Sequence, residues 1–467
     1  MARAPELYLG TCSPIEHPDQ SSLCCLPAHH LLTHTVVVGM TGSGKSGLLT
    51  VMVEEALSSH VPVLMIDIKG DLPNLLLGFP GFDAKSIEPW VEPTPGDDCD
   101  PETLAVQAAS ERETALRAWG IREQHLRDYN QHTEIRVITP GSNAGEPLHV
   151  LSALERPASD WEKDPTSARA SLAAAVSLVL RLLGRDPDPA RSKEHVLLSV
   201  LAEERGKRGE PSRLEDLLAD VTKPPIETVG ALPIDRFVSK RDRAELAAAL
   251  NALLASPSFA TWREGVALDV GSWLTPRNGR TPGVIVSVAH LDDEERALVL
   301  GVVLEEVVTW LRHQGGSKRL RALVVFDEVY GYLPPHPANP PTKRPLVTLM
   351  KQARAYGVGI VVATQNPMDL DYRALSNAGL WCVGRLQTDA DRARVVEGLA
   401  LNNGHEGTTT AQLSELTKSL APRWFVLRDV HAAEPTRLLQ PRWAMSFLHG
   451  PMTPEDIRRA RAKPLRR

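Results

Sequence analysis

A glycine-rich loop near the start of the chain has the residue types and the spacing that bind phosphate. Gly39 is followed by four residues and then by Gly44, Lys45 and Ser46, which matches GxxxxGK[ST] in full. Glycines let backbone N–H groups surround an anion, the lysine reaches the β- and γ-phosphates, and the serine hydroxyl suits Mg²⁺. The loop therefore predicts ATP and Mg²⁺ as cofactors. The predicted nucleotide ligands are Gly39, Thr41, Gly42, Ser43, Gly44, Lys45, Ser46 and Gly47, with Ser46 also a metal ligand.

An acidic pair follows a second apolar run. The stretch LVVFDE places Asp327 and Glu328 directly after four strand-forming residues. Neighbouring residues of a strand point in opposite directions, so one carboxylate can meet Mg²⁺ through its water shell while the other polarises an attacking water. We therefore predict that Asp327 is a metal and nucleotide ligand and that Glu328 is catalytic. The alternative is a surface acidic pair at the end of a strand.

Three further side chains have types that suit phosphoryl transfer. Gln365 ends the run GVGIVVATQ, where a neutral amide can contact the γ-phosphate or a water; a strand-end cap is the alternative. Arg354 in KQARAYG and Arg385 in VGRLQTD are planar cations that can stabilise charge on the transferred group. Solvated surface arginines are common, so that role remains the alternative for both. The predicted catalytic set is Glu328, Arg354, Gln365 and Arg385.

The elements around these residues predict an α/β fold. Four β-prone residues, 35–38, precede the glycine loop, and an apolar stretch with helical spacing, 48–57, follows it. The run VPVLMIDIKGD reads as a buried parallel strand with a polar carboxyl end, where doubly wound sheets bind ligands. Further buried strands are expected in PGVIVSVAHL, LRALVVFDEV, GVGIVVATQN and LWCVGRLQ. The expected core is a mainly parallel sheet with helices on both faces.

The region between the two halves of this core has a different character. Its residues are arranged at helical spacing, apart from one short strand candidate at 134–142, and turn clusters such as GRDPDP and TKPP separate the pieces. We therefore expect a mostly helical insertion. The expected division of the chain is an N-terminal extension at 1–33, a core at 34–95 and 281–450, an insertion at 96–280 and a basic tail at 451–467.

Composition bounds the class of protein. The chain has 467 residues and a formal net charge of −6, which neither supports nor excludes binding to DNA. No apolar run approaches the ~18 residues of a membrane span and no signal peptide is recognisable, so we expect a cytoplasmic protein without a membrane partner. Five cysteines do not predict a disulfide framework and fit a reducing compartment. The cysteines and histidines between positions 12 and 34 leave a zinc site open, although a packed loop is expected because no CxxC pair is present.

With these motifs, the chain resembles the FtsK–HerA superfamily of P-loop motor ATPases, in its HerA-like bacterial branch. The resemblance implies a RecA-like P-loop NTPase core, Mg²⁺-dependent ATP hydrolysis, a homo-hexameric ring and often work on double-stranded DNA beside a nuclease or other effector protein. It also implies that Lys45 and Ser46 bind phosphate and Mg²⁺, that Gln365 is the sensor and that Arg354 is the arginine finger. The stretches that carry it are GMTGSGKSGLL, LMIDIKGDLPNLLL, LVVFDEVYGYLPP, LMKQARAYGVGIVVATQNPMDLDYRALSNAG and CVGRLQTDADRARVVEGL.

Two functions fit these expectations. The first is a ring-forming ATPase motor that acts on DNA as a translocase or helicase-like protein. The second is a nucleotide-gated assembly or signalling ATPase, for example of a defence complex, that moves no DNA. Stimulation of the ATPase by duplex DNA in a salt-sensitive way would separate them.

Overall fold

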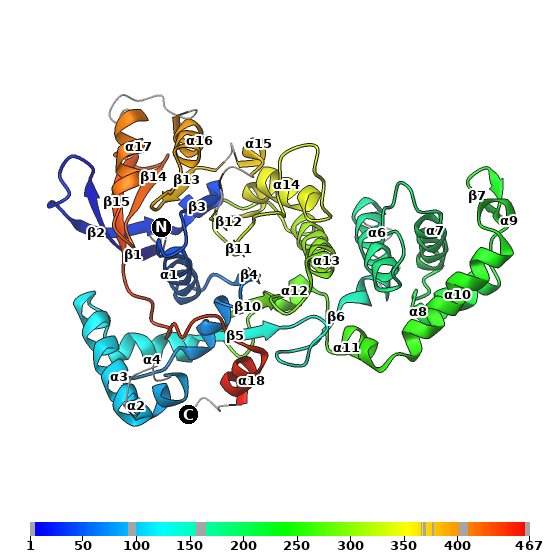
Figure 1. Ribbon diagram of the computed structural model, residues 1–467, viewed down its shortest axis with the longest axis horizontal. Coiled ribbons are helices and arrows are strands. Elements are labelled where there is room, and N and C mark those ends of the chain that lie inside the picture. The colour runs from blue at the N-terminus through cyan, green and yellow to red at the C-terminus, as the bar shows by residue number, and fades with distance from the viewer. Residues whose placement is uncertain are drawn as a thin grey trace.

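The computed structural model describes residues 5–91, 100–155, 165–365, 367, 370–375, 378–400 and 410–462. Its described part is built around one 11-stranded sheet with the order β2-β1-β15-β14-β13-β3-β12-β11-β4-β10-β5 (Figure 1). The strands are β1 (Glu6–Pro14), β2 (Ser22–Pro27), β3 (Thr35–Val38), β4 (Val63–Asp67), β5 (Thr133–Ile138), β10 (Thr281–Ser287), β11 (Ala322–Asp327), β12 (Val358–Thr364), β13 (Leu380–Val383), β14 (Phe425–Asp429) and β15 (Thr436–Pro441).

The sheet has a parallel part and an antiparallel extension. The strands from β13 to β5 in that order pair in parallel, whereas β14, β15, β1 and β2 pair antiparallel. The central parallel strands consist of fully buried residues, as their uninterrupted apolar runs predict. The predicted α/β class with a mainly parallel, RecA-like sheet is confirmed.

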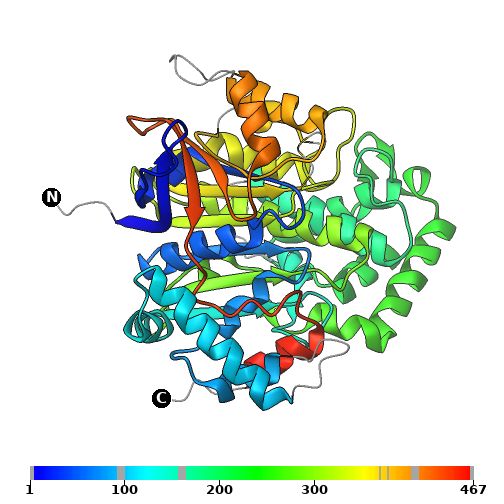
Figure 2. The same ribbon diagram turned by 60° about the vertical axis from the view of Figure 1, so that its left-hand side comes forward.

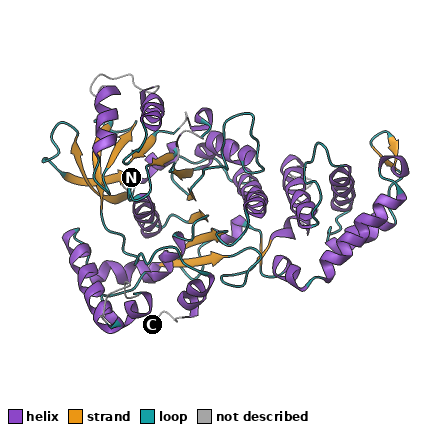
Figure 3. Ribbon diagram, in the orientation of Figure 1, coloured by secondary structure: helices purple, strands orange, loops and turns teal. Residues whose placement is uncertain are grey.

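Helices cover both faces of this sheet, as Figure 3 shows by the purple helices around the orange strands. Val37 and Met65 belong to the buried apolar cluster that includes helix α1 (Lys45–Ser58), whereas Val36 and Leu64 belong to the cluster on the other side, with α13. Alternate residues of a strand face opposite sides, so each strand contributes to both clusters. The other helices that pack near the sheet are α2 (Ala84–Ile87), α3 (Pro101–Ala118), α4 (Glu123–His132), α12 (Val270–Trp273), α13 (Asp293–Arg312), α14 (Lys343–Gln352), α15 (Tyr372–Leu375), α16 (Asp389–Ala400), α17 (Thr410–Ser419) and α18 (Pro454–Ala462).

A helical arm extends from one side of the sheet (Figures 1 and 2). Val176 in its first helix and Val303 in α13 are part of one continuous buried cluster, and the hydroxyl oxygens of Ser171 and Thr309 lie 3.2 Å apart across the same contact. The arm therefore shares its apolar core with the sheet. Its elements are α6 (Pro165–Leu182), α7 (Lys193–Lys207), α8 (Leu214–Thr222), β7 (Thr228–Val229), β8 (Leu232–Pro233), α9 (Ile234–Phe237), α10 (Lys240–Ala255) and α11 (Ala260–Arg263), with β6 (Leu148–His149) and β9 (Val266–Ala267) paired at its base.

The expected division of the chain needs correction at two places. The strand candidate expected within the insertion at 96–280 is β5, which pairs with β10 at the edge of the main sheet. The expected N-terminal extension at 1–33 contains β1 and β2, which form the opposite edge of that sheet. Both differences have one cause: the pairing of these edge strands is set by partners remote in sequence, which local composition does not reveal. We now propose that the separate helical unit is limited to about residues 148–267.

A buried ion-pair network ties the P-loop helix to the end of the chain. The Arg442 guanidinium, which follows β15, donates to Glu54 at 3.0 Å and to Glu55 at 2.8 Å, both in α1. Glu54 and Arg442 are fully buried, and the backbone N–H groups of Met445 and Ser446 also donate to the Glu54 carboxylate. A buried charge pair needs such additional hydrogen bonds to offset its desolvation.

The N-terminal hairpin differs from the expectation for cysteine. Cys12 of β1 and Cys24 of β2 form a disulfide, while Cys25 is exposed and Cys382 buried in the sheet. Antiparallel neighbours bring the two side chains together, a pairing that spacing alone did not predict. None of the described helices is both long and apolar enough to cross a membrane.

Candidate nucleotide-hydrolysis site

The P-loop connects β3 to α1 at the carboxyl edge of the parallel strands. Gly42 and Gly44 have φ angles of 78° and 94°, in the left-handed region that side chains with a Cβ disfavour. The Met40 N–H donates to the Arg385 carbonyl at 2.8 Å, which fixes the loop to the segment after β13. Gly44 of the motif and the neighbouring Gly42 therefore have backbone conformations that favour glycine, and the start of α1 faces the sheet edge where a phosphate would bind.

Lys45 is folded onto its own loop. Its ammonium group donates to the carbonyls of Gly39 and Met40, the latter at 3.1 Å, and its side chain is buried. Burial, together with the nearby charge of Lys69, lowers the pKa of Lys45 to about 8. A phosphate would supply the counter-charge that this buried ammonium lacks.

Asp327 ends β11 beside the P-loop and is also buried. Burial raises its pKa to about 7, and its Oδ2 atom has no hydrogen-bond partner among the described residues. Across the site, the Ser46 hydroxyl donates to Asp71 Oδ2 at 3.2 Å. A desolvated carboxylate oxygen without a partner and a serine hydroxyl beside a second carboxylate are the oxygen donors that Mg²⁺ prefers. The residues present therefore fit the predicted metal ion.

Glu328 is held by contacts from two neighbouring strands. Its Oε2 atom accepts a hydrogen bond from Lys69 Nζ at 2.7 Å, and its Oε1 atom accepts from the Thr364 hydroxyl at 2.9 Å and from the Gln365 N–H at 3.2 Å. Its φ angle is 65°, an uncommon backbone conformation for a residue with a side chain. Such strain persists only where surrounding contacts enforce it, and it is frequent at functional sites.

Gln365 joins the end of β12 to the P-loop. The Thr41 hydroxyl donates to Gln365 Oε1 at 2.6 Å, and Thr41 is exposed at the tip of the loop. The amide predicted as a sensor therefore contacts the P-loop through its side chain and Glu328 through its backbone N–H. The structure brings together the predicted residues Thr41, Lys45, Ser46, Asp327, Glu328 and Gln365 at one edge of the sheet.

The two candidate arginines lie at opposite edges. Arg385 follows β13 and is exposed beside the P-loop, where its carbonyl binds Met40. Arg354 precedes β12 and is exposed at the amino edge. The six residue steps from Val358 to Thr364 span about 20 Å at ~3.3 Å each, so Arg354 is remote from the P-loop of its own chain.

Sequence reasoning assigned no role to several residues that build this site. Asp67 accepts hydrogen bonds from the Gly70 N–H at 2.9 Å and from the Ser287 hydroxyl at 2.7 Å, and burial raises its pKa to about 6. These contacts shape the turn that carries Lys69 and Asp71 into the site. The sequence contains a sign of these residues, because Asp67, Lys69 and Asp71 stand at the end of the apolar run VPVLMIDIKGD.

Arg423 is a further residue that the sequence did not indicate. Its N–H donates to the Ser43 carbonyl at 3.0 Å, and its guanidinium lies over the Trp443 ring, 3.3 Å from the ring centre. A Cβ built on Gly44 would lie 2.9 Å from the Arg423 side chain, so the two residues are in close contact. Arg423 therefore supports the P-loop from the antiparallel part of the sheet.

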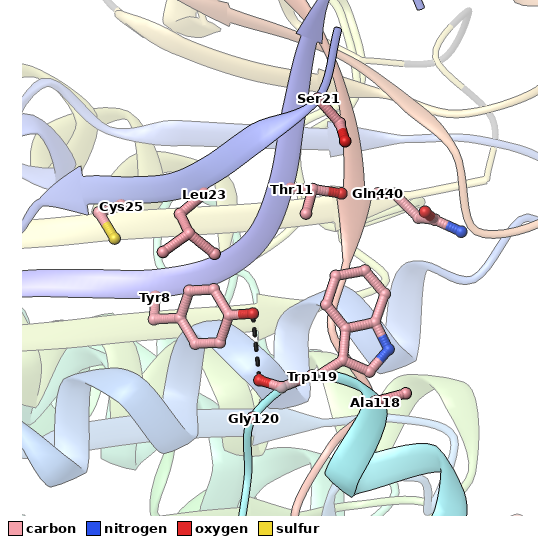
Figure 4. A pocket seen from close by; sticks show the side chains of 9 residues that line it. All are labelled: Tyr8, Thr11, Ser21, Leu23, Cys25, Ala118, Trp119, Gly120 and Gln440. Carbon is pink, nitrogen blue, oxygen red and sulfur yellow. Dashed lines mark hydrogen bonds between the residues drawn. The ribbon is translucent and has the colours of Figure 1, made fainter. Parts of the chain in front are cut away.

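A separate cavity of about 730 Å³ lies between the β1–β2 hairpin and the end of α3 (Figure 4). The Tyr8 hydroxyl donates to the Trp119 carbonyl at 3.2 Å on one side of it. None of the residues that line it belongs to the predicted nucleotide site. They are Tyr8, Thr11, Ser21, Leu23, Cys25, Ala118, Trp119, Gly120 and Gln440.

A model of a known family matches the part of the chain that carries the P-loop. Residues 18–134 match the family model described as the central domain of helicase HerA. This part of the chain is therefore similar to the HerA central domain. The matched range includes the P-loop, α1, β4 and the turn with Lys69, which are the parts of the site that lie in the first third of the chain. No curated protein sequence matches the chain.

Solved structures agree with the fold. VirB4 of Thermoanaerobacter pseudethanolicus is similar with a TM-score of 0.52 at 12% identity, over 94% of this chain and 96% of that one. The plasmid coupling protein TrwB in complex with the non-hydrolysable ATP analogue ADPNP has a TM-score of 0.48 at 14% identity, over 91% of this chain and 90% of that one. At such identity the likeness to VirB4 shows the fold alone.

Proposed function

We propose that this protein belongs to the FtsK–HerA superfamily and is a Mg²⁺-dependent ATPase of HerA-like type. The observation that carries the proposal is the convergence of a P-loop lysine, a desolvated aspartate and a restrained glutamate at one sheet edge. The lysine follows β3 and the two carboxylates stand at the end of β11, and a bound nucleotide with Mg²⁺ would offset the buried charges of Lys45 and Asp327.

Each residue has a distinct role in this proposal. Lys45 binds the β- and γ-phosphates, and Ser46 and Asp327 hold Mg²⁺, which supplies charge neutralisation on the phosphate oxygens. Glu328 accepts a hydrogen bond from the attacking water and orients it in line with the γ-phosphate. Gln365 contacts the γ-phosphate or the water and transmits its presence to the P-loop through Thr41.

We further propose that the protein works as a ring, a homo-hexamer, that acts on double-stranded DNA. Arg354 supports the ring, because a finger about 20 Å from its own site can serve only a neighbour's nucleotide in this conformation. The family model that matches residues 18–134 is that of a helicase, HerA, which fits work on DNA.

The ATPase proposal is tested by two variants with different expected defects. Lys45→Ala should lose binding of a labelled ATP analogue, whereas Glu328→Gln should bind ATP and Mg²⁺ and lose turnover by roughly two to four orders of magnitude. If Glu328→Gln lost affinity together with rate, Glu328 would be structural.

The DNA proposal needs a separate measurement. Duplex DNA should raise the ATPase rate, and the stimulation should fall steeply with added salt because phosphate contacts release counterions. An ATPase rate that duplex DNA leaves unchanged at low salt would favour the nucleotide-gated assembly ATPase instead.

A further inference from the structure

An exposed tryptophan ring lies one side chain away from the P-loop. Trp443 follows β15 and is 45% exposed, although Arg442 before it and Met445 after it are buried. The Arg423 guanidinium lies over this ring, 3.3 Å from its centre, and the Arg423 N–H donates to the Ser43 carbonyl at 3.0 Å. We call the side chains of Arg423 and Trp443 the Arg–Trp stack.

The backbone and the side chain of Arg423 are both held in place. Its φ angle is 63°, in the left-handed region that residues with a Cβ rarely adopt. Its Nη2 atom donates to the Pro441 carbonyl at 2.9 Å, in addition to the contact of its N–H with Ser43. Such backbone strain persists only where surrounding contacts enforce it, and it is frequent at functional sites. Arg423 therefore fixes the orientation of the Trp443 ring relative to the P-loop.

The order of the strands puts the Arg–Trp stack and Glu328 on opposite sides of the P-loop. β12 and β11, which carry Gln365 and Glu328, lie on one side of β3, whereas β13, β14 and β15 lie on the other. The start of β14 and the end of β15 pair with each other at the same sheet edge as the P-loop. In the proposed ATPase the γ-phosphate faces Glu328 and Gln365, so the ribose and the base extend toward β14 and β15.

The first turn of α1 leaves room for the ribose. A Cβ built on Gly47 would meet nothing within 4 Å, so no side chain of the described residues fills the space beside it. A Cβ on Gly44, in contrast, would lie 2.9 Å from the Arg423 side chain. The P-loop is thus open at its helix and closed by the Arg–Trp stack at its centre.

We propose that the exposed part of the Trp443 ring binds the purine base of the nucleotide by stacking, with Arg423 as the positioning residue. This inference rests on the proposed function and adds a base subsite to the nucleotide site. Stacking depends on the area of the base and not on the groups at its edge, because every base has a π-face. The subsite therefore accepts adenine and guanine alike.

Nucleotide binding with and without a base tests the subsite. Isothermal titration calorimetry measures the affinities for ADPNP, for the GTP analogue GDPNP and for inorganic tripolyphosphate, each with Mg²⁺. Trp443→Leu keeps an apolar side chain without a π-face, so the affinities for ADPNP and GDPNP should each fall about 10-fold. The affinity for tripolyphosphate, which has no base, should change less than about twofold. Trp443→Phe keeps an aromatic ring and should lose about threefold or less for either nucleotide.

A second tryptophan and the contacts of Arg442 provide the controls. Trp119 lines the separate cavity of Figure 4 and is partly exposed, so Trp119→Leu should leave all three affinities unchanged. The Trp443 carbonyl accepts a hydrogen bond from Arg442 at 2.8 Å, and this backbone contact remains in Trp443→Leu. Cooperative unfolding in urea verifies that each variant is folded.

Three results would overturn the base subsite. One is an ADPNP affinity that Trp443→Leu leaves unchanged. Another is an equal fall in the affinities for ADPNP and tripolyphosphate, which would show that the ring only supports the P-loop. The third is a wild type that binds GDPNP far more weakly than ADPNP, since the edge of the base would then be read. A wild type that bound neither the two nucleotides nor tripolyphosphate would instead contradict the proposed ATPase itself.

Discussion

Mixing two inactive variants should restore ATPase activity if Arg354 acts on a neighbouring site. Arg354→Ala keeps a complete P-loop and acidic pair, and Glu328→Gln keeps a complete arginine. Because Arg354 lies about 20 Å from the carboxyl end of its own β12, each interface combines one chain's site with the other chain's arginine. Arg354→Ala alone should lose about 10³- to 10⁵-fold in rate. Glu328→Gln alone should lose roughly two to four orders of magnitude.

The expected ATPase rate of the mixture can be calculated. In a 1:1 mixture with random assembly, half of the sites come from Arg354→Ala chains and half of their neighbours are Glu328→Gln chains. One interface in four is then whole, so the rate should reach about a quarter of the wild-type rate if interfaces act independently. The assay is steady-state phosphate release after the variants have exchanged subunits. No recovery, with exchange verified by a fluorescence label, would refute a finger supplied by the neighbour.

Three further perturbations test parts of the structure. Arg442→Met leaves the buried Glu54 carboxylate without its cationic partner and should lower the free energy of unfolding by about 3–5 kcal/mol. Urea unfolding measures this loss, which should be smaller in the double variant Glu54→Gln/Arg442→Met because no buried charge is left. Burial raises the pKa of Asp327 to about 7, so the nucleotide-free fold loses stability as pH rises from about 4 to 7. Asp327→Asn should therefore raise the melting temperature at about pH 8 and barely change it at about pH 4. Thr41→Val removes the hydrogen bond from the Thr41 hydroxyl to Gln365 and should lower kcat about 2- to 10-fold with KM nearly unchanged. Thr41→Ser keeps the hydroxyl and should keep the wild-type kcat. The same kcat in both variants would show that this hydrogen bond does not contribute to turnover.

The parts of the site that local sequence predicts are those built from contiguous residues. The P-loop is one, since β3, its glycines and the start of α1 follow each other without interruption. Asp327 and Gln365 could also be placed, because each ends an apolar run and parallel strands bring such ends to one edge. Roles based on chemistry alone, such as that of Gln365, stay predictions.

Local sequence did not predict contacts between segments that are remote along the chain. Lys69 was visible as a charge after a strand, but its partner Glu328 lies 259 residues further on. Arg423 had no signal at all, because its contact with Ser43 depends on how the antiparallel strands fold back onto the sheet. The same holds for the disulfide of Cys12 and Cys24 and for the pairing of β5, which are decided by sheet order.

The contacts of Glu328 indicate how nucleotide could change the site. Thr41, Gln365, Glu328 and Lys69 form a continuous chain of hydrogen bonds from the P-loop across the end of β12 to the turn after β4. In the proposed ATPase, a bound γ-phosphate would compete with Glu328 for Lys69, since an anion of higher charge attracts the same ammonium group. Releasing Lys69 frees one oxygen of Glu328 for water, while Thr364 still holds the other. β11 and β12 carry this chain of bonds at one end, and Arg354 precedes β12 at the other, so in the proposed ring a change at the nucleotide would reach the neighbouring subunit through two buried strands.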